Sequence, residues 1–311
     1  MTDKSPQSSP GSLLRKLIVH LDNFDGLIND SSIRDQVREL IPVNRLLRDL
    51  GKSVLQRPDA ASARSRILIY LRTYVGKVIA GDELMVVAGI SEYARRIREL
   101  RVEYGWPIIS GVTAAEIADD SENDQDVPQM KVDDYILLRD EKDTEAAERW
   151  KTAKKIRNEK SGARDKLIKF FITNVGQVIT GEELRYVAKI SAWPRRIREL
   201  RTEHGWPIAT SITGRPDLSV GTYILERKHQ SPPHDRKIKD SVRRKVLQRD
   251  EHRCQDCEWH HEQWNPSDPR HLEVHHLIMH SKRGKNTEEN LLTLCNICHD
   301  DRHGTEHSAD K

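Results

Sequence analysis

The 311-residue sequence is poor in aromatic residues and cysteines, and it has no long apolar segment. Apolar residues make up 36% of the chain and charged residues 32%, a balance typical of small soluble domains rather than of one large core. Because no apolar run approaches the roughly 18 residues of a membrane span, we expect no membrane protein. The N-terminal residues form no apolar signal segment, so the sequence predicts a cytoplasmic protein.

Net positive charge is also scarce, at +3 for the whole chain. Bulk basicity therefore gives no support to nucleic-acid binding, and such a role would depend on local clusters of basic residues. The four cysteines all lie within positions 254–298, and ten of the fourteen histidines lie within 252–307. In a reducing cytosol, cysteines paired in this way indicate metal ligands rather than disulfides.

The middle of the chain contains an internal duplication. Residues 81–108 and 181–208 are identical at 19 of 28 positions, at an offset of 100. The similarity resumes at 135–137 and 223–225, where the offset is 88, so the first copy carries twelve extra residues. These extra residues are rich in aspartate and glutamate, which repel phosphate, so we expect this segment to be disordered or turned away from DNA.

Each copy shows the pattern helix, helix, turn, helix and then two strands. Helix-turn-helix followed by a β-hairpin resembles the winged-helix fold, whose third helix enters the major groove of DNA. The third helix of both copies carries the sequence RRIRELR, and this repetition favours DNA contact over an ordinary solvated helix face. The predicted DNA-binding residues are Arg95, Arg96, Arg98, Arg195, Arg196, Arg198 and Arg201. Since the first copy has the acidic insertion, we expect the second copy to make the closer contact.

The segments outside the two copies have their own patterns. An N-terminal helical segment carries an apolar stripe, which we expect Pro42 to break in two. A stretch of mixed charge between the copies predicts a solvated linker helix, and the prolines at 232 and 233 indicate a second linker.

Near the C-terminus, two Cys-x-x-Cys pairs predict a closed tetrahedral zinc site. The four ligands would be Cys254, Cys257, Cys295 and Cys298. Such a site is structural, because it stabilises a domain too small for a self-sufficient core.

The same segment contains a histidine pair, a central asparagine and a Cys-His sequence, at His275, His276, Asn290 and Cys298-His299. Together with the zinc cysteines, these residues resemble the HNH endonuclease family, which has a ββα-metal fold. The resemblance implies that His276 is the general base that deprotonates water, and that His275 and His299 bind one catalytic divalent cation.

The resemblance implies further roles for three neighbouring residues. Asn290 would hold the loop that carries the base, and Glu273 would support the site. His303 lies where some family members have another metal ligand. The cation would be Mg²⁺, Mn²⁺ or another divalent ion, and the products would carry 5′-phosphate and 3′-hydroxyl ends.

The sequence therefore predicts a multidomain α+β protein with two tandem winged-helix domains and a zinc-stapled nuclease domain. The predicted ranges are 1–60 for the N-terminal helical segment, 61–140 and 163–228 for the winged-helix domains, 141–162 and 229–237 for the linkers, and 238–311 for the HNH domain. This layout is similar to that of restriction endonucleases, and it implies a prokaryotic source.

Several alternatives stay open at this point. A modification-dependent nuclease would sense a methylated base, and a homing or phage nicking enzyme would use the same chemistry. A zinc-containing DNA-binding regulator would have no catalytic activity. The predicted partners are double-stranded DNA, a second copy of the chain at least on DNA, and, as a candidate, a companion DNA methyltransferase.

Overall fold

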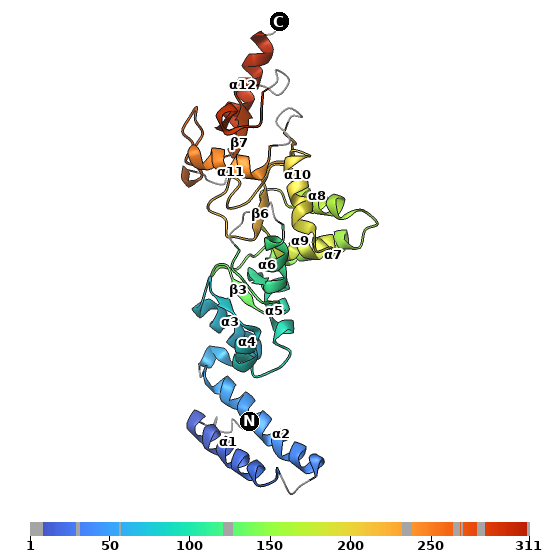
Figure 1. The fold of residues 1–311 in the computed structure, drawn as a ribbon, viewed down its shortest axis with the longest axis vertical. Coiled ribbons are helices and arrows are strands. Elements are labelled where there is room, and N and C mark those ends of the chain that lie inside the picture. Colours follow the sequence, from blue (N-terminus) through green and yellow to red (C-terminus); the bar gives the residue numbers. More distant parts are fainter. Residues whose placement is uncertain are drawn as a thin grey trace. The chain divides into compact units, whose positions relative to one another are not determined.

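The structure is a computed structural model, shown in Figure 1. It describes residues 9–28, 32–55, 57–120, 127–231, 238–263, 268, 270–278 and 284–309, with only the backbone of 303–309. The fold is mixed α+β and mostly helical. The chain divides into two compact units, one of Met1–Ile108 and Asp133–Thr144, the other of Ile109–Val132 and Glu145–Lys311. Within the described residues, no helix has the length and apolar character needed to cross a membrane.

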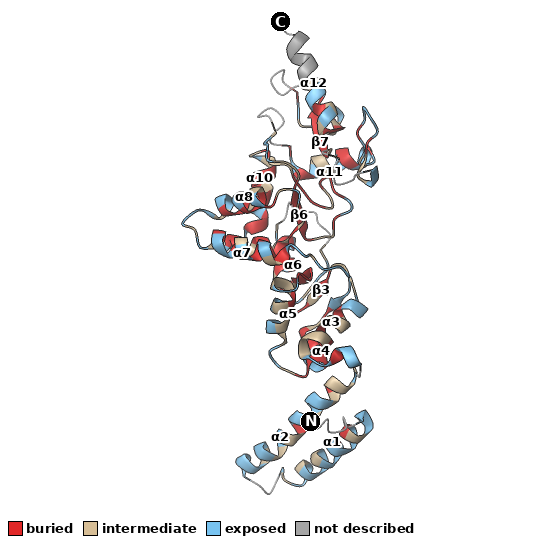
Figure 2. Ribbon diagram, turned by 180° about the vertical axis from the view of Figure 1, so that it is seen from behind, coloured by how far each residue is buried: buried red, intermediate tan, exposed pale blue. Residues whose placement is uncertain are grey.

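The first unit begins with a helical hairpin, α1 (Pro10–Asp25) and α2 (Ile33–Ser53). The side chains of Ser9 and Ser32 cap the two helices by accepting hydrogen bonds from backbone N–H groups. Few residues of the hairpin are buried, and Figure 2 shows it largely in the colours of exposed and intermediate residues.

Helix α2 runs through Pro42, so the predicted break at this proline is wrong. Proline removes one backbone hydrogen bond inside a helix, at a cost of about 3 kcal/mol. The next residue, Val43, is buried in the hairpin, and packing of this kind offsets the cost by holding the helix on both sides of the proline.

The first repeat follows in the same unit. Its helices are α3 (Ala63–Thr73), α4 (Gly81–Ala88) and α5 (Tyr93–Val102), after a short 3₁₀ turn at Pro58–Ala60. Strand β1 (Val78–Ile79) pairs antiparallel with β3 (Tyr135–Leu137), and β3 lies between β1 and the start of β2 (Ile108–Ser110). Leucine and isoleucine side chains from all three helices form one core with Trp106.

The second repeat lies in the other unit and reproduces these elements. Its helices α8 (Ala163–Thr173), α9 (Gly181–Ala188) and α10 (Trp193–Thr202) match α3, α4 and α5 at an offset of 100. Strands β4 (Ile179–Thr180), β6 (Thr222–Leu225) and β5 (Ile208–Ala209) form a sheet in the order β4-β6-β5.

Two helices that the sequence assigns elsewhere pack on this second repeat. Helix α6 (Gly111–Ala118) belongs to the extra segment of the first copy, yet it contacts α9 and α10. Helix α7 (Ala146–Arg157) is the predicted linker helix, but one face is buried, with an ion pair between Arg149 and Glu183. The linker is therefore packed rather than solvated.

The C-terminal domain completes the second unit. It consists of α11 (Asp240–Arg249), the 3₁₀ turns His261–Gln263 and Glu288–Asn290, β7 (Leu272–His276), β8 (Leu291–Cys295) and α12 (Asn296–Ala309). The two strands form an antiparallel pair on which α11 and α12 pack. The core includes Trp259 and the apolar residues of both strands.

Candidate active site and metal centre

The cysteine quartet, defined as Cys254, Cys257, Cys295 and Cys298, comes together as the sequence predicts. Its four sulfur atoms all lie within 4.8 Å of one another. Cys295 ends β8 and Cys298 lies in the first turn of α12, so the chain reversal at this point presents both thiols on one side.

The geometry of the quartet suits one tetrahedral ion. Thiolates bound at about 2.3 Å from a tetrahedral zinc ion lie about 3.8 Å from one another. The sulfur atoms of Cys257 and Cys295 are 3.7 Å apart. Four soft ligands at this spacing could hold a zinc ion and would then leave no position open for substrate.

Strand β7 presents the histidine pair. In its antiparallel ladder, His275 lies opposite Leu292 and His276 opposite Leu291. Consecutive strand residues point to opposite faces, so the two rings have different neighbours. His275, His276 and His299 are all buried, with exposures of 1%, 1% and 2%.

The structure brings His275 and His299 together. The two ring centroids are 5.0 Å apart, and the rings meet edge to face. Nδ1 of His299 lies 2.5 Å from Oε2 of Glu273, two residues before His275 on the same face of β7. A carboxylate at Nδ1 favours the tautomer with a proton on that nitrogen, which leaves Nε2 of His299 able to bind a cation.

Glu273 is the centre of a buried polar network. Besides His299, it contacts Nε2 of His271 at 3.0 Å and accepts a hydrogen bond from Arg227 at 2.8 Å. Burial alone would raise the pKa of the Glu273 carboxyl, but hydrogen bonds from His271 and His299 lower this pKa well below its ordinary value. Glu273 is therefore a carboxylate at neutral pH.

His276 contacts a residue that the sequence analysis missed. Its Nε2 lies 2.7 Å from Oδ1 of Asn286, in the segment between the two strands. The sequence offers no pattern that would single out Asn286, because the fold of this segment, not the spacing along the chain, brings it to the ring.

Asn290 joins both sides of the same segment. Its Oδ1 accepts from the N–H of Ile278 at 2.8 Å, and its Nδ2 donates to the carbonyls of Ile278 and Lys285 at 3.0 and 2.9 Å. These three hydrogen bonds fix the chain directly after the histidine pair. His303 lies in α12, and its side chain falls outside the described residues.

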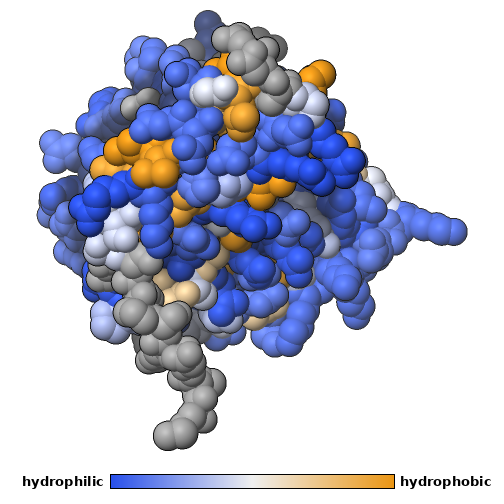
Figure 3. All heavy atoms as spheres, turned by 90° about the horizontal axis from the view of Figure 1, so that it is seen from below, coloured by the Kyte–Doolittle hydropathy of each residue, from blue (hydrophilic) through white to orange (hydrophobic). Residues whose placement is uncertain are grey.

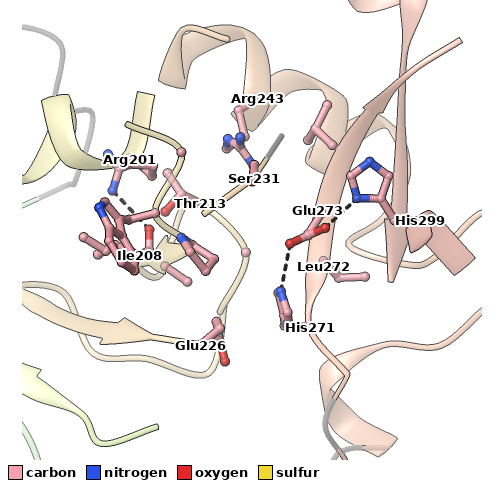
Figure 4. Close-up of a pocket in the computed structure, with 16 residues that line it drawn as sticks. Arg201, Ile208, Thr213, Glu226, Ser231, Arg243, His271, Leu272, Glu273 and His299 are labelled. Atoms are coloured by element: carbon pink, nitrogen blue, oxygen red, sulfur yellow. Dashed lines mark hydrogen bonds and ion pairs between the residues drawn. The ribbon is translucent and has the colours of Figure 1, made fainter. Parts of the chain in front are cut away.

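A small pocket lies beside this network, within the second unit (Figure 4). The second repeat supplies Arg201 and Glu226 to its wall, and the C-terminal domain supplies His271, Glu273 and His299. In Figure 4 the carboxylate of Glu273 points to His271 on one side and to His299 on the other. The second repeat therefore forms part of the wall of the pocket that Glu273 and His299 line.

The predicted DNA-binding arginines fall into two groups. Arg95, Arg98 and Arg195 are exposed, and Arg96 and Arg196 are partly exposed and pair with glutamates of their own helices. In contrast, the side chain of Arg198 is 14% exposed and pairs with Asp120.

Arg201 is the most enclosed of the seven. Its side chain is 8% exposed and its guanidinium binds both carboxylate oxygens of Asp240, at the start of α11. It also donates to the carbonyl of Ile208, as Arg101 does to Ile108 in the first repeat. In this structure Arg201 joins the second repeat to the C-terminal domain and is not open to a phosphate.

Comparisons with known families agree with this organisation. The sequence profile of the HNH endonuclease family matches residues 254–305, which contain the cysteine quartet and the histidine site. The profile of the KpnI N-terminal domain matches residues 64–138 and 164–226, which are the two repeats. No curated protein and no solved structure matches the chain.

The HNH match distinguishes a nuclease from a DNA-binding regulator, two interpretations that the sequence leaves open. A regulator without catalysis would carry no nuclease domain, so that interpretation is set aside. KpnI is a restriction enzyme, and the repeats match its N-terminal domain. The chain therefore contains an HNH endonuclease domain, which indicates a hydrolase that cleaves DNA, and its repeats match a domain of a restriction enzyme, which is consistent with a restriction-type HNH endonuclease.

Proposed function

We propose that the protein is a sequence-specific restriction endonuclease that uses one divalent cation and a histidine general base. The observation that carries this proposal is the close approach of His275 and His299, whose rings meet edge to face. Glu273 holds the ring of His299, and His276 follows His275 on strand β7. Two imidazoles, with water and phosphate oxygens as the remaining ligands, could hold a divalent cation, and the third imidazole can move a proton.

His276 acts as the base in this proposal. The contact of Nε2 with Oδ1 of Asn286 favours the tautomer with the proton on Nε2, and in this tautomer Nδ1 is the basic nitrogen that would take a proton from the attacking water. Asn286 and Asn290 keep the ring in place, the first directly and the second through the backbone that follows it. Attack of water on phosphorus with release of the 3′ oxygen leaves 5′-phosphate and 3′-hydroxyl ends.

His275 and His299 would hold the cation, with His303 as a further ligand. When bound, the cation neutralises charge that develops on the phosphate and on the leaving oxygen. Glu273 orients His299 through Nδ1 and is not itself placed as a ligand. The cysteine quartet would hold zinc and serve only to stabilise the domain.

The two repeats act as winged-helix DNA-binding domains in this proposal, over 61–140 and 163–228. In each repeat, two helices joined by a four-residue turn follow one short strand and precede the other two strands of the sheet, an order that suits a helix-turn-helix unit followed by a hairpin. The exposed arginines of α5 and α10 supply the positive charge that phosphate contacts require.

Cleavage of both strands at a palindromic site calls for two active sites related by a two-fold axis. We propose that the α1–α2 hairpin pairs two copies of the chain, at least on DNA. Apolar side chains remain exposed on both helices, namely Leu14, Ile18, Leu21, Val37, Leu40, Ile41 and Leu47. Figure 3, which views the structure from below, shows apolar residues at the surface among hydrophilic ones.

Cleavage of plasmid and genomic DNA tests the proposed activity. We expect cutting with Mg²⁺ or Mn²⁺, none with EDTA, and sequenced ends that share one site with 5′-phosphates. Digestion of methylated and unmethylated DNA in parallel separates an ordinary restriction enzyme, paired with a protecting methyltransferase in a prokaryotic cytoplasm, from a modification-dependent one. Intact DNA under all metal conditions would refute the proposal.

Light scattering of the protein alone and on a cleavable duplex tests the dimer. We expect Ile41→Glu, in the apolar stripe, to yield monomers that only nick DNA. The control Val132→Glu adds the same charge at an exposed residue of the other unit and leaves the dimer intact. A wild-type monomer in both states would contradict the dimer.

A further inference from the structure

The two helix-turn-helix units have nearly the same sequence but differ in exposure. On α5, Ala94 and Arg98 are exposed. On α10, the matching Pro194 is buried and Arg198 is partly buried. These positions lie among the first six of the ten residues of each helix, and in helix-turn-helix proteins the N-terminal part of this helix contacts base edges in the major groove.

Helix α6 and the residues after it cover this part of α10. Oε2 of Glu116 accepts hydrogen bonds from Nε1 of Trp193 at 2.7 Å and from Nε of Arg185 at 2.9 Å. Asp120, two residues beyond α6, forms the ion pair with Arg198. Two carboxylates thus occupy the side of α10 that DNA would have to approach.

Hydrogen bonds to Glu182 of α9 also hold the start of α6. Oε1 of Glu182 accepts from the backbone N–H of Ser110, from its hydroxyl and from the hydroxyl of Thr113, at 2.8, 2.5 and 2.7 Å. A Cβ atom added at Gly181 would lie 3.0 Å from the Thr113 side chain, so glycine allows this close approach. The corresponding residue of the first repeat, Asp82, is exposed.

The N-terminal part of α10, residues 193–198, is therefore unsuited to the major groove. To reach phosphate, Arg198 would have to leave Asp120, and a buried carboxylate left without its partner costs several kcal/mol. Glu116 and Asp120 would also face the phosphates of the duplex, which repel them. On α5, Arg95 and Arg98 are exposed.

We propose that the two repeats have different tasks: residues 93–98 of α5 enter the major groove, and the matching residues 193–198 of α10 are a docking site for α6. This inference rests on the proposed DNA-binding function. It reverses the sequence-based expectation that the second copy makes the closer contact. At the other end of α10, Arg201 forms an ion pair with Asp240 of the nuclease domain. The second repeat therefore anchors the nuclease domain.

The matched pair Arg98 and Arg198 tests the proposal. Binding of a fluorescein-labelled duplex with a randomised centre would be measured at several salt concentrations, with His276→Ala as the background so that no DNA is cut. We expect Arg98→Ala to reduce the slope of log affinity against log salt by about 1, the value for one lost phosphate contact. Sequencing of the bound duplexes should show the same preferred bases as for the background, because a phosphate contact carries no base information.

For Arg198→Ala we expect an unchanged salt slope, unchanged sequence preference and a lower melting temperature. Since loss of a buried ion pair can prevent folding, a second variant, Arg198→Met with Asp120→Asn, removes both charges together and should bind DNA as the background does. A reduced slope for this double variant with a normal slope for Arg98→Ala would overturn the proposal.

The variant Asp120→Asn distinguishes a permanently docked α6 from an α6 that inhibits DNA binding and can be displaced. If α6 were a displaceable mimic of DNA, this variant would bind the duplex more tightly and with a steeper salt slope, which would also overturn the proposal; we expect the slope to stay unchanged. Failure of the background protein to bind any duplex would instead contradict the proposed function itself.

Discussion

The two ends of the β7–β8 pair carry opposite kinds of chemistry. At one end, Leu272 lies opposite Cys295 of the cysteine quartet, and at the other, His276 lies opposite Leu291. In the proposed function, the quartet holds a structural zinc ion, whereas the histidines act on a cation and on water. The two ends of the strand pair would then separate stability from catalysis, so substitutions at the two ends should have different effects.

The largest effect is expected at the cysteine end. Cys295→Ser removes one of four ligands, and in a domain this small the free energy of metal binding is free energy of folding. We expect loss of zinc in metal analysis and rapid proteolysis of residues 238–311, while the repeats keep their own thermal transition. The control Ile297→Ser changes an exposed residue between the two cysteines and should retain zinc. A folded, zinc-free nuclease domain would show that the two ends do not differ in this way.

At the histidine end, His276→Ala should abolish cleavage without unfolding. It removes the base but no zinc ligand, so we expect cleavage below about 1% of wild type, with DNA binding within a few-fold and zinc content unchanged. His229→Ala changes an exposed histidine and should cut normally. Residual cleavage well above that level would rule out His276 as the base.

Glu273→Gln should weaken the cation site more than the fold. Loss of the carboxylate that orients His299 is expected to lower Mn²⁺ affinity about 10–100-fold, measured by calorimetry. Cleavage should recover at higher metal concentration, which a structural defect would not allow. Glu262→Gln, at an exposed glutamate, is the control. Equal Mn²⁺ affinity in both variants would leave Glu273 without the proposed role.

The smallest effect is expected from Asn290→Ala, because its three hydrogen bonds lie near the surface. We expect the free energy of unfolding of the nuclease domain to fall by about 1–3 kcal/mol, with a partial loss of cleavage. The neighbouring exposed residue provides the control, Glu289→Ala, which should change neither. Full activity in the asparagine variant would mean that the loop needs no such support.

The features predicted from the sequence are those that depend on local patterns. The repeat was visible because 19 of 28 positions are identical, and the structure keeps the same helix bounds at an offset of 100. The cysteine quartet followed from spacing alone, since Cys-x-x-Cys has few other uses in a reducing compartment.

The features that were missed depend on contacts between distant segments. Arg98 and Arg198 occupy identical sequence motifs, and only the docking of α6 makes one exposed and the other an ion-pair partner. Arg227 and Asn286 lie in no recognisable pattern, yet they contact Glu273 and His276. A motif therefore gives the chemistry a residue can perform, and the fold decides whether it is free to perform it.

The course of the chain between the two units has a practical consequence for engineering. It passes from one unit to the other three times, after residues 108, 132 and 144, although the duplication suggests two separable modules. A truncation at the apparent repeat boundary, near residue 140, would strip α6 from the second repeat and expose Glu182, Trp193 and Arg198. A chimera that transplants the nuclease half onto another DNA-binding protein would need residues 109–132 as a separate graft.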